Sequence, residues 1–231
     1  NKLCKHGGAA IFANRTRSVQ TIIQQIIDLN DREYDLSGIQ KYSNTSEMNR
    51  IAKLMADYYG CDHLYTKACL LGVAPHYSNL PNGLRLSIEY AFRKKDLHLV
   101  ICTSTLAQGV NIPIKYLFMT SFMLDQNSMK IRNFQNLMGR TARSGMYTEG
   151  SVIVTDSELF DNKNNRSNGG VYKWENCVKM FDRHAAEPCE SSILWLVQNI
   201  KINHDDYVKG AYIANYIINN YSHWDCFESC Y

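Results

Sequence analysis

The segment Asn133-Phe-Gln-Asn-Leu-Met-Gly-Arg-Thr-Ala-Arg-Ser-Gly145 is the most informative part of this 231-residue chain. Its first half is helical in character, because apolar residues starting at Ile131 recur at helical spacing until Gly139 breaks the pattern. Arg140 and Arg143 follow, three residues apart. A guanidinium group stays charged and presents five donors in a planar fork, which suits phosphate oxygens. The spacing predicts a phosphate clamp, with solvated or helix-capping arginines as the alternative.

A second informative segment lies upstream, Ile101-Cys-Thr-Ser-Thr-Leu-Ala-Gln-Gly-Val-Asn-Ile-Pro113. The apolar run from Leu97 to Cys102 predicts a buried strand, which ends in three hydroxyl side chains at 103–105. Small hydroxyl and glycine residues just past the carboxyl end of a parallel strand are where open α/β sheets bind ligands. We therefore expect the strand end to offer hydrogen-bond donors and the later helix to offer arginines.

Apolar runs alternate with amphipathic helical patterns along residues 1–156. Strands are predicted at 9–13, 70–75, 97–102, 116–121 and 151–155, helices after 16, from 46 to 60, after 81 and from 131 to 138, and loops at 31–44 and 124–130. This alternation is typical of a parallel sheet covered on both faces. After Ser157 the pattern changes to a polar linker at 161–170 and helical patterns at 174–184, 191–200 and 205–220, which predict a small helical extension.

Four segments resemble motifs of superfamily-two helicases, in the form used by the superkiller-like (DExH) branch. Ala10-Ile-Phe-Ala-Asn-Arg15 is similar to motif IV, Gly72-Val-Ala-Pro-His-Tyr-Ser-Asn-Leu80 to the histidine-containing segment before motif V, Thr103–Pro113 to motif V, and Asn136–Gly145 to motif VI. They occur in the family's order. The resemblance implies that residues 1–156 form the second RecA-like lobe, a three-layer α/β/α fold with a mainly parallel sheet, followed by the helical extension 157–231.

The resemblance also implies roles for single residues. Arg143 would be the arginine finger, with Arg140 beside it on the γ-phosphate. The ATP side would further include Gly109, Asn111, Asn136 and Gly139, and the nucleic-acid side Thr103, Ser104, Asn14, Arg15 and His76. For Asn14 and Arg15 a role in forming the turn is an equal alternative, and a lone histidine after a strand is more often structural.

The chain departs from the family pattern at three positions. Asn136 stands where the family has Gln or His, and Tyr77 stands where it has the second His of a pair. Ala142 replaces the glycine between the two arginines, which requires a negative φ there if Arg143 is to keep its aim.

Other motifs of such enzymes are absent from the sequence. It contains no Gly-x-x-x-x-Gly-Lys-Ser/Thr phosphate loop and no Asp-Glu-x-His or Asp-Glu-Ala-Asp run. We therefore expect ATP and Mg²⁺ to be bound mainly by a preceding N-terminal lobe, and the missing initiating Met fits a segment of a longer protein. The expected function is the C-terminal lobe of an ATP-dependent helicase on single-stranded DNA or RNA, inactive by itself. The alternative is a non-catalytic nucleic-acid- or protein-binding module with the same fold.

Composition sets broader limits. A hydrophobic content of 45% is sufficient for a core, and a net charge of +3 does not by itself indicate nucleic-acid binding. No signal peptide and no apolar run of about 20 residues is present, and the 8 cysteines are scattered, so we expect reduced thiols in a cytoplasmic protein without membrane partners. His223, Cys226 and Cys230 lack the second ligand pair of a structural zinc site, so no metal site is expected.

Overall fold

The computed structural model describes residues 2–107, 112–124, 127–141, 147–166, 169–182 and 184–185. In this part of the chain a five-stranded sheet has the order β2-β3-β1-β4-β7, and every pairing in it is parallel. The strands are β1 (Ala9–Phe12), β2 (Val73–His76), β3 (Leu99–Cys102), β4 (Tyr116–Met119) and β7 (Ser151–Val154). The predicted α/β class and parallel sheet are confirmed.

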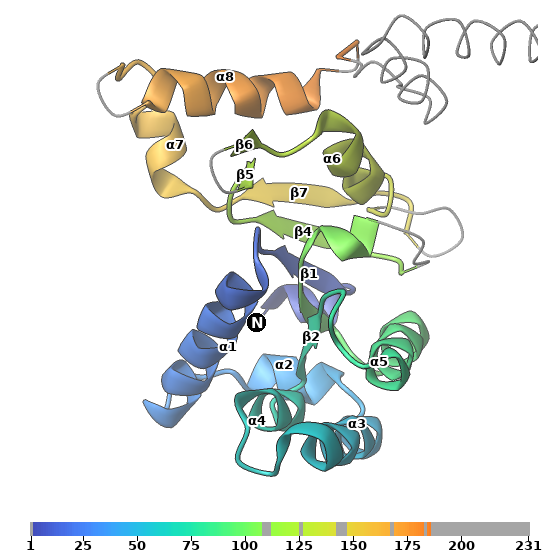
Figure 1. The fold of residues 1–231 in the computed structure, drawn as a ribbon. Coiled ribbons are helices and arrows are strands. Elements are labelled where there is room, and N and C mark those ends of the chain that lie inside the picture. Colours follow the sequence, from blue (N-terminus) through green and yellow to red (C-terminus); the bar gives the residue numbers. More distant parts are fainter. Residues whose placement is uncertain are drawn as a thin grey trace, which may run out of the picture. The chain divides into compact units, whose positions relative to one another are not determined.

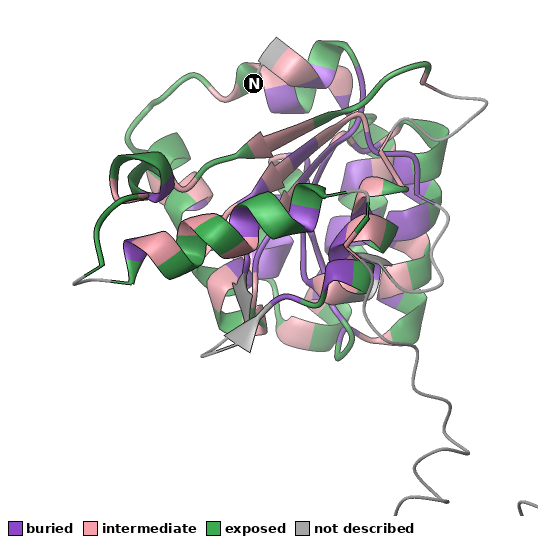
Figure 2. Cartoon of the chain, turned by 90° about the horizontal axis from the view of Figure 1, so that it is seen from above, coloured by how far each residue is buried: buried purple, intermediate pink, exposed green. Residues whose placement is uncertain are grey.

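Helices cover both faces of the sheet. Helix α1 (Thr16–Asp31) lies on one side, and α5 (Asn82–Lys94) and α6 (Ile131–Met138) lie on the other (Figure 1). The predicted apolar stripe of α6 is buried at Ile131, Phe134 and Leu137. The three layers place the hydrophobic core between each helix and the sheet, as Figure 2 shows for the buried strands at the centre.

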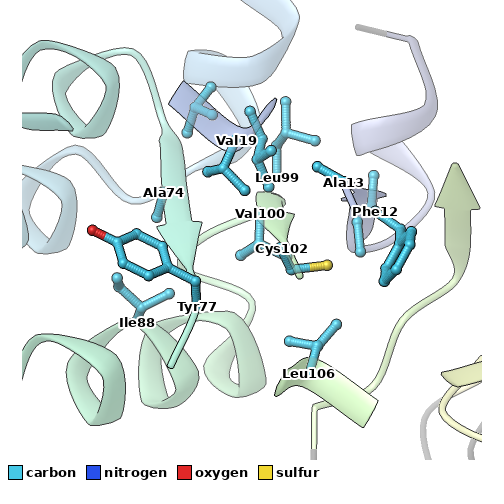
Figure 3. Close-up of a cluster of buried hydrophobic side chains, with 14 of the residues drawn as sticks. Phe12, Ala13, Val19, Ala74, Tyr77, Ile88, Leu99, Val100, Cys102 and Leu106 are labelled. Atoms are coloured by element: carbon cyan, nitrogen blue, oxygen red, sulfur yellow. The ribbon is translucent and has the colours of Figure 1, made fainter. Parts of the chain in front are cut away.

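The sheet interior is apolar on both faces, which is usual for parallel strands covered by helices. Strands β2 and β3 are buried at every position. Side chains from neighbouring strands form one cluster, in which Val100 and Cys102 of β3 lie between Ala74 of β2 and Phe12 of β1 (Figure 3). Strand β2 is an edge strand and is nevertheless buried, because α4 (Leu64–Leu70) packs against it.

Two short helices differ from the prediction. The predicted loop 31–44 contains α2 (Ser37–Tyr42), and α4 precedes β2, so the predicted strand at 70–75 begins only at Val73. These helices have 6 and 7 residues, which is too short for a helical period to stand out. Helix α3 (Thr45–Tyr59) matches the prediction, and the Asn44 side chain caps it by accepting from two backbone N–H groups, those of Ser46 at 3.1 Å and Glu47 at 3.3 Å.

The remaining elements are small. Turns of 3-10 helix form η1 (Lys2–Lys5) and η2 (Ser104–Ala107), and the predicted loop at 124–130 contains part of a two-stranded antiparallel pair, β5 (Met123–Leu124) and β6 (Asn127–Ser128). Helices α7 (Ser157–Asp161) and α8 (Gly170–Phe181) contact each other, and α8 also contacts α6.

Several predictions cannot be compared with the structure. Outside the described residues lie the helices predicted at 191–200 and 205–220, together with His223, Cys226 and Cys230. The helix predicted from 174 can be compared, and α8 begins earlier, at Gly170. The division of the chain at residue 156 stays a prediction. Within the described part, no helix combines the length and the apolar character that crossing a bilayer requires.

Candidate functional site

The carboxyl ends of the strands meet at one edge of the sheet. The register pairs Cys102, the last residue of β3, with both Phe12 of β1 and His76 of β2, and it pairs Phe12 with Met119 of β4. Each of these residues ends its strand. The five predicted nucleic-acid residues lie within three residues of these strand ends, so the structure brings them to the same edge.

Thr103 is held at this edge by the strand on its outer side. Its backbone N–H donates to the carbonyl of His76 at 3.1 Å, which extends the hydrogen-bond ladder one residue past β3. The Thr103 side chain is largely buried, with 7% of the residue exposed, and Ser104 begins the turn η2 and is half-buried. The position of Thr103 is therefore set by the end of β2 as well as by β3, the strand that Thr103 follows.

Asn14 and Arg15 form the turn between β1 and α1. The Asn14 Oδ1 accepts a hydrogen bond from the Ser18 Oγ at 2.9 Å, which fastens the turn to the first turn of the helix. Arg15 has an extended backbone with φ −140° and ψ 157°, and its side chain is exposed. Asn14 thus performs the turn-forming role that was one of its two alternatives, and Arg15 is the more exposed of the two.

His76 ends β2, and its side chain faces the interior. The residue has no exposed surface, and its Nε2 lies 2.9 Å from Oε1 of Glu89 on α5. Burial lowers the pKa of His76, and the hydrogen bond to Glu89 opposes this shift. The enclosed ring and its hydrogen bond favour the structural role that was the alternative for this histidine, and its place in the nucleic-acid site stays a prediction. Tyr77 also faces inward, with its ring centroid 6.0 Å from that of Tyr65.

The motif VI segment is joined to the end of motif V. The backbone N–H of Ile114 donates to the Arg140 carbonyl at 3.1 Å, and Thr141 pairs with Ile114 in a parallel bridge. Helix α6 also contacts η2, which contains the start of motif V. The two motifs, which residues 114–135 separate in the sequence, are therefore adjacent in the fold.

The residues at the end of α6 have different surroundings. Helix α6 ends at Met138, and Gly139 after it keeps a right-handed backbone with φ −61°. No left-handed turn is therefore required at Gly139. Arg140 is half-buried, while Asn136 and Gly139 are exposed. Arg143, Gly109 and Asn111 lie outside the described residues, so their roles stay predictions.

Sequence reasoning missed three polar residues at this edge. Thr120 follows β4 and donates from both its backbone N–H, at 3.3 Å, and its Oγ1, at 2.8 Å, to the Phe12 carbonyl. Glu89 and Arg85 lie on α5. A signal for Glu89 was available, because it is a charged residue directly after Ile88 and three residues before Phe92 in the helix predicted after 81.

Comparison with known proteins identifies this arrangement. Residues 41–145 match the family model described as the helicase conserved C-terminal domain. The matched range contains β2, β3 and β4, and it ends with the segment that carries the two arginines. Residues 41–145 are a superfamily-two helicase C-terminal domain. The predicted helicase lobe is therefore confirmed.

Relatives of this helicase lobe agree with the assignment. The Hachiman protein HamB of Bacillus cereus is 26% identical over 198 residues, which cover 85% of this chain and 17% of that protein. A POLQ-like helicase of Caenorhabditis elegans is 35% identical over 89 residues, or 38% of this chain and 10% of its own length. The ATP-dependent DNA helicase Hel308 of Aeropyrum pernix is 30% identical over 92 residues, 38% of this chain and 12% of that protein. The chain thus spans less than a fifth of the length of these curated relatives.

Proposed function

We propose that this chain supplies the C-terminal half of an ATP-dependent helicase that acts on a single nucleic-acid strand. The observation that supports this function is the shared edge, where the residues after β1 and β3 lie together and motif VI is joined to motif V through Ile114 and Arg140. One edge can then contact a strand while the adjoining segment reaches ATP. DNA is the first strand to test, because Hel308 is named as a DNA helicase.

On the ATP side, Arg143 is the arginine finger and Arg140 lies beside it. Gly109, Asn111, Asn136 and Gly139 face the nucleotide, while an N-terminal lobe of the parent protein holds the phosphates and Mg²⁺. A finger of this kind stabilises the charge that develops on the transferred phosphoryl group and raises the rate by about 10³–10⁵. Hydrolysis therefore requires the two lobes to close on one ATP.

On the nucleic-acid side, Thr103, Ser104 and Arg15 contact the phosphate backbone. Hydroxyl groups and guanidinium groups both donate hydrogen bonds to phosphate oxygens. Asn14 holds the turn from which Arg15 extends, and His76 supports Thr103 through its backbone carbonyl. Because motif V joins motif VI directly, a change in ATP state shifts the same backbone that holds Thr103.

The deciding experiment replaces Arg143 with alanine in the intact parent protein. We expect Arg143→Ala to reduce nucleic-acid-stimulated ATP hydrolysis by about three orders of magnitude or more, while ATP binding persists. Arg132→Ala is the matched control, because Arg132 is an exposed arginine on α6 and its loss removes the same charge. Near-normal turnover in Arg143→Ala would rule out the finger assignment.

A non-catalytic binding module is the second candidate. Ala142 favours it, because a Cβ at this position restricts the backbone between the two arginines. The Arg143→Ala experiment also addresses this candidate. If the unmodified parent protein binds single strands but shows no stimulated ATP hydrolysis, the lobe serves binding alone.

A further inference from the structure

Glu89 is a buried carboxylate that joins two parts of the nucleic-acid edge. The residue is 7% exposed, on the face of α5 that packs toward β2. Its Oε1 lies 2.9 Å from Nε2 of His76 and 3.9 Å from Nε of Arg85. A buried carboxylate is retained when it has such partners, because an unpaired one is strongly destabilising.

The contact with His76 is directional. The hydrogen bond joins Nε2 of His76 and Oε1 of Glu89, and a carboxylate accepts it when Nε2 carries the ring hydrogen. In the described structure Nδ1 of His76 is buried and makes no hydrogen bond, which agrees with a neutral ring whose Nδ1 has no hydrogen to donate. The single hydrogen bond at Nε2 therefore sets the orientation of the ring.

Arg85 connects Glu89 to the loop that follows β2 in the sequence. Its Nη1 donates to the Ser78 carbonyl at 3.4 Å, and its Nη2 donates to Oδ1 of Asn82 at 2.8 Å. The Arg85 side chain is 32% exposed, whereas Glu89 is enclosed. Glu89 thus contacts both His76, at the end of β2, and Arg85. Arg85 in turn hydrogen-bonds to Ser78 and Asn82, which follow β2 in the sequence.

The end of β2 is also the support of Thr103. The His76 carbonyl accepts the Thr103 N–H at 3.1 Å, so a shift of the His76 backbone moves the residue that begins motif V. We propose that Glu89 is a positioning residue, which fixes His76 at the end of β2 and thereby holds Thr103 where it contacts a nucleic-acid strand. This inference rests on the proposed function, because it assigns Glu89 to the same nucleic-acid edge.

The test measures the affinity of the intact parent protein for a fluorescent oligo-dT strand. Glu89→Met removes the hydrogen bond at similar volume, Glu89→Gln keeps an acceptor for Nε2, and Thr103→Val removes the strand contact. Thr66→Val is the matched control, because Thr66 is also buried and its Oγ1 donates one hydrogen bond, to the Gly60 carbonyl at 2.9 Å. The circular dichroism spectrum of each variant checks its fold.

We expect Glu89→Met and Thr103→Val each to weaken binding about tenfold, the effect of losing one hydrogen bond to a charged group. The double variant Glu89→Met with Thr103→Val should bind the strand no more weakly than Thr103→Val alone, because both changes remove the same contact. Glu89→Gln and Thr66→Val should remain within about twofold of the unmodified protein, since neither displaces the end of β2. A loss of stability alone does not produce this coupling.

A second variant tests positioning if Glu89→Met does not fold. The double variant His76→Leu with Glu89→Met fills the same space with apolar groups, so it should fold and still bind the strand about tenfold more weakly. Recovery of full affinity in this variant would show that the pair only fills space and would overturn the inference.

The outcomes also separate this inference from the proposed function. If Thr103→Val weakens binding but Glu89→Met does not, or if the two effects multiply to about a hundredfold, Glu89 does not position Thr103 and the proposed function is unaffected. If Thr103→Val itself has no effect, Thr103 is not a strand contact, and both assignments are overturned together.

Discussion

Glu89 and His76 carry polar groups into the interior of the lobe, where such groups are strongly dependent on each other. Both residues are next in sequence to members of the buried apolar cluster, since Ile88 precedes Glu89 and Tyr77 follows His76, and Figure 3 shows Ile88 beside Tyr77. In such surroundings the hydrogen bond gives direction rather than large net stability, because both groups lost their water when they were buried. Single and paired substitutions therefore have different effects.

Breaking the pair should destabilise the lobe more than replacing it. Glu89→Met leaves the buried His76 N–H without an acceptor, so we expect the free energy of unfolding to fall by about 1–3 kcal/mol. The double variant His76→Leu with Glu89→Met should recover most of that loss, because no polar group is left unsatisfied. Urea unfolding of the chain measures both values. A double variant that is less stable than Glu89→Met would contradict this account.

The pair should also make the stability of the lobe sensitive to acid. Burial lowers the pKa of His76 in the folded state, so below about pH 6.5, the usual histidine pKa, the unfolded chain takes up a proton that the folded chain does not. The free energy of unfolding therefore falls as the pH decreases from about 6.5 toward the folded pKa, by up to about 1.4 kcal/mol per pH unit.

Urea unfolding at several pH values between 7.5 and 5.5 measures this dependence. The double variant His76→Leu with Glu89→Met is the comparison, because His63 and His98, whose pKa values burial also lowers, remain in it. We expect a shallower loss of stability in the double variant. Equal slopes would show that His76 does not take part.

At the scale of elements, two glycines differ in how much space surrounds them. Gly8 precedes β1, and a Cβ added there would lie 2.5 Å from Cζ of Phe92, a buried residue of α5. Gly8 also donates its N–H to the Tyr147 hydroxyl at 3.1 Å, which fixes the chain shortly before β7. Gly83, in the first turn of α5, has open space where its Cβ would be.

These surroundings predict opposite effects of the same substitution. Gly8→Ala should lower the free energy of unfolding by about 1–3 kcal/mol, because the Phe92 ring is enclosed and cannot move aside without strain. Gly83→Ala should raise it by about 0.5–1 kcal/mol, because alanine restricts the unfolded chain and favours helix. Thermal unfolding of the two variants checks the signs, and a stabilised Gly8→Ala would mean that α5 can shift away from β1.

At the scale of the whole molecule, the proposed ATP site is divided between two lobes. The described edge offers hydrogen-bond donors and, from motif VI, Arg140, whereas this sequence contains no Gly-x-x-x-x-Gly-Lys-Ser/Thr phosphate loop and no Asp-Glu-x-His or Asp-Glu-Ala-Asp run. Phosphoryl transfer requires the metal and the phosphate-binding lysine as well as the finger. Catalysis is therefore proposed to arise only when two lobes meet.

This division of the site predicts that the 231-residue chain by itself does not hydrolyse ATP, with or without single-stranded DNA. The measurement is phosphate release by the folded chain, with the intact parent protein as the positive control. We expect no release above that of a catalytically dead parent carrying Arg143→Ala. Clear turnover by the chain alone would mean that its phosphate-binding residues lie elsewhere in the sequence.

Local patterns were sufficient for the α/β class and the parallel sheet, and the resemblance of four short segments to helicase motifs predicted the helicase lobe. The periods of strands and long helices, and the short motifs around Thr103 and Arg140, depend on neighbouring residues, so a sequence displays them directly. The same patterns could not reveal α2 and α4, whose 6 and 7 residues are too few for a helical period to be recognised.

Tertiary structure decided which way the polar residues face. His76 belongs to a motif that suggested a surface contact, and it lies inside because Glu89, thirteen residues later, reaches it from α5. The adjacency of Ile114 and Arg140, and the support of Thr103 by His76, likewise arise from packing and strand register. Burial and hydrogen-bond partners are set by residues distant in sequence, which no local pattern contains.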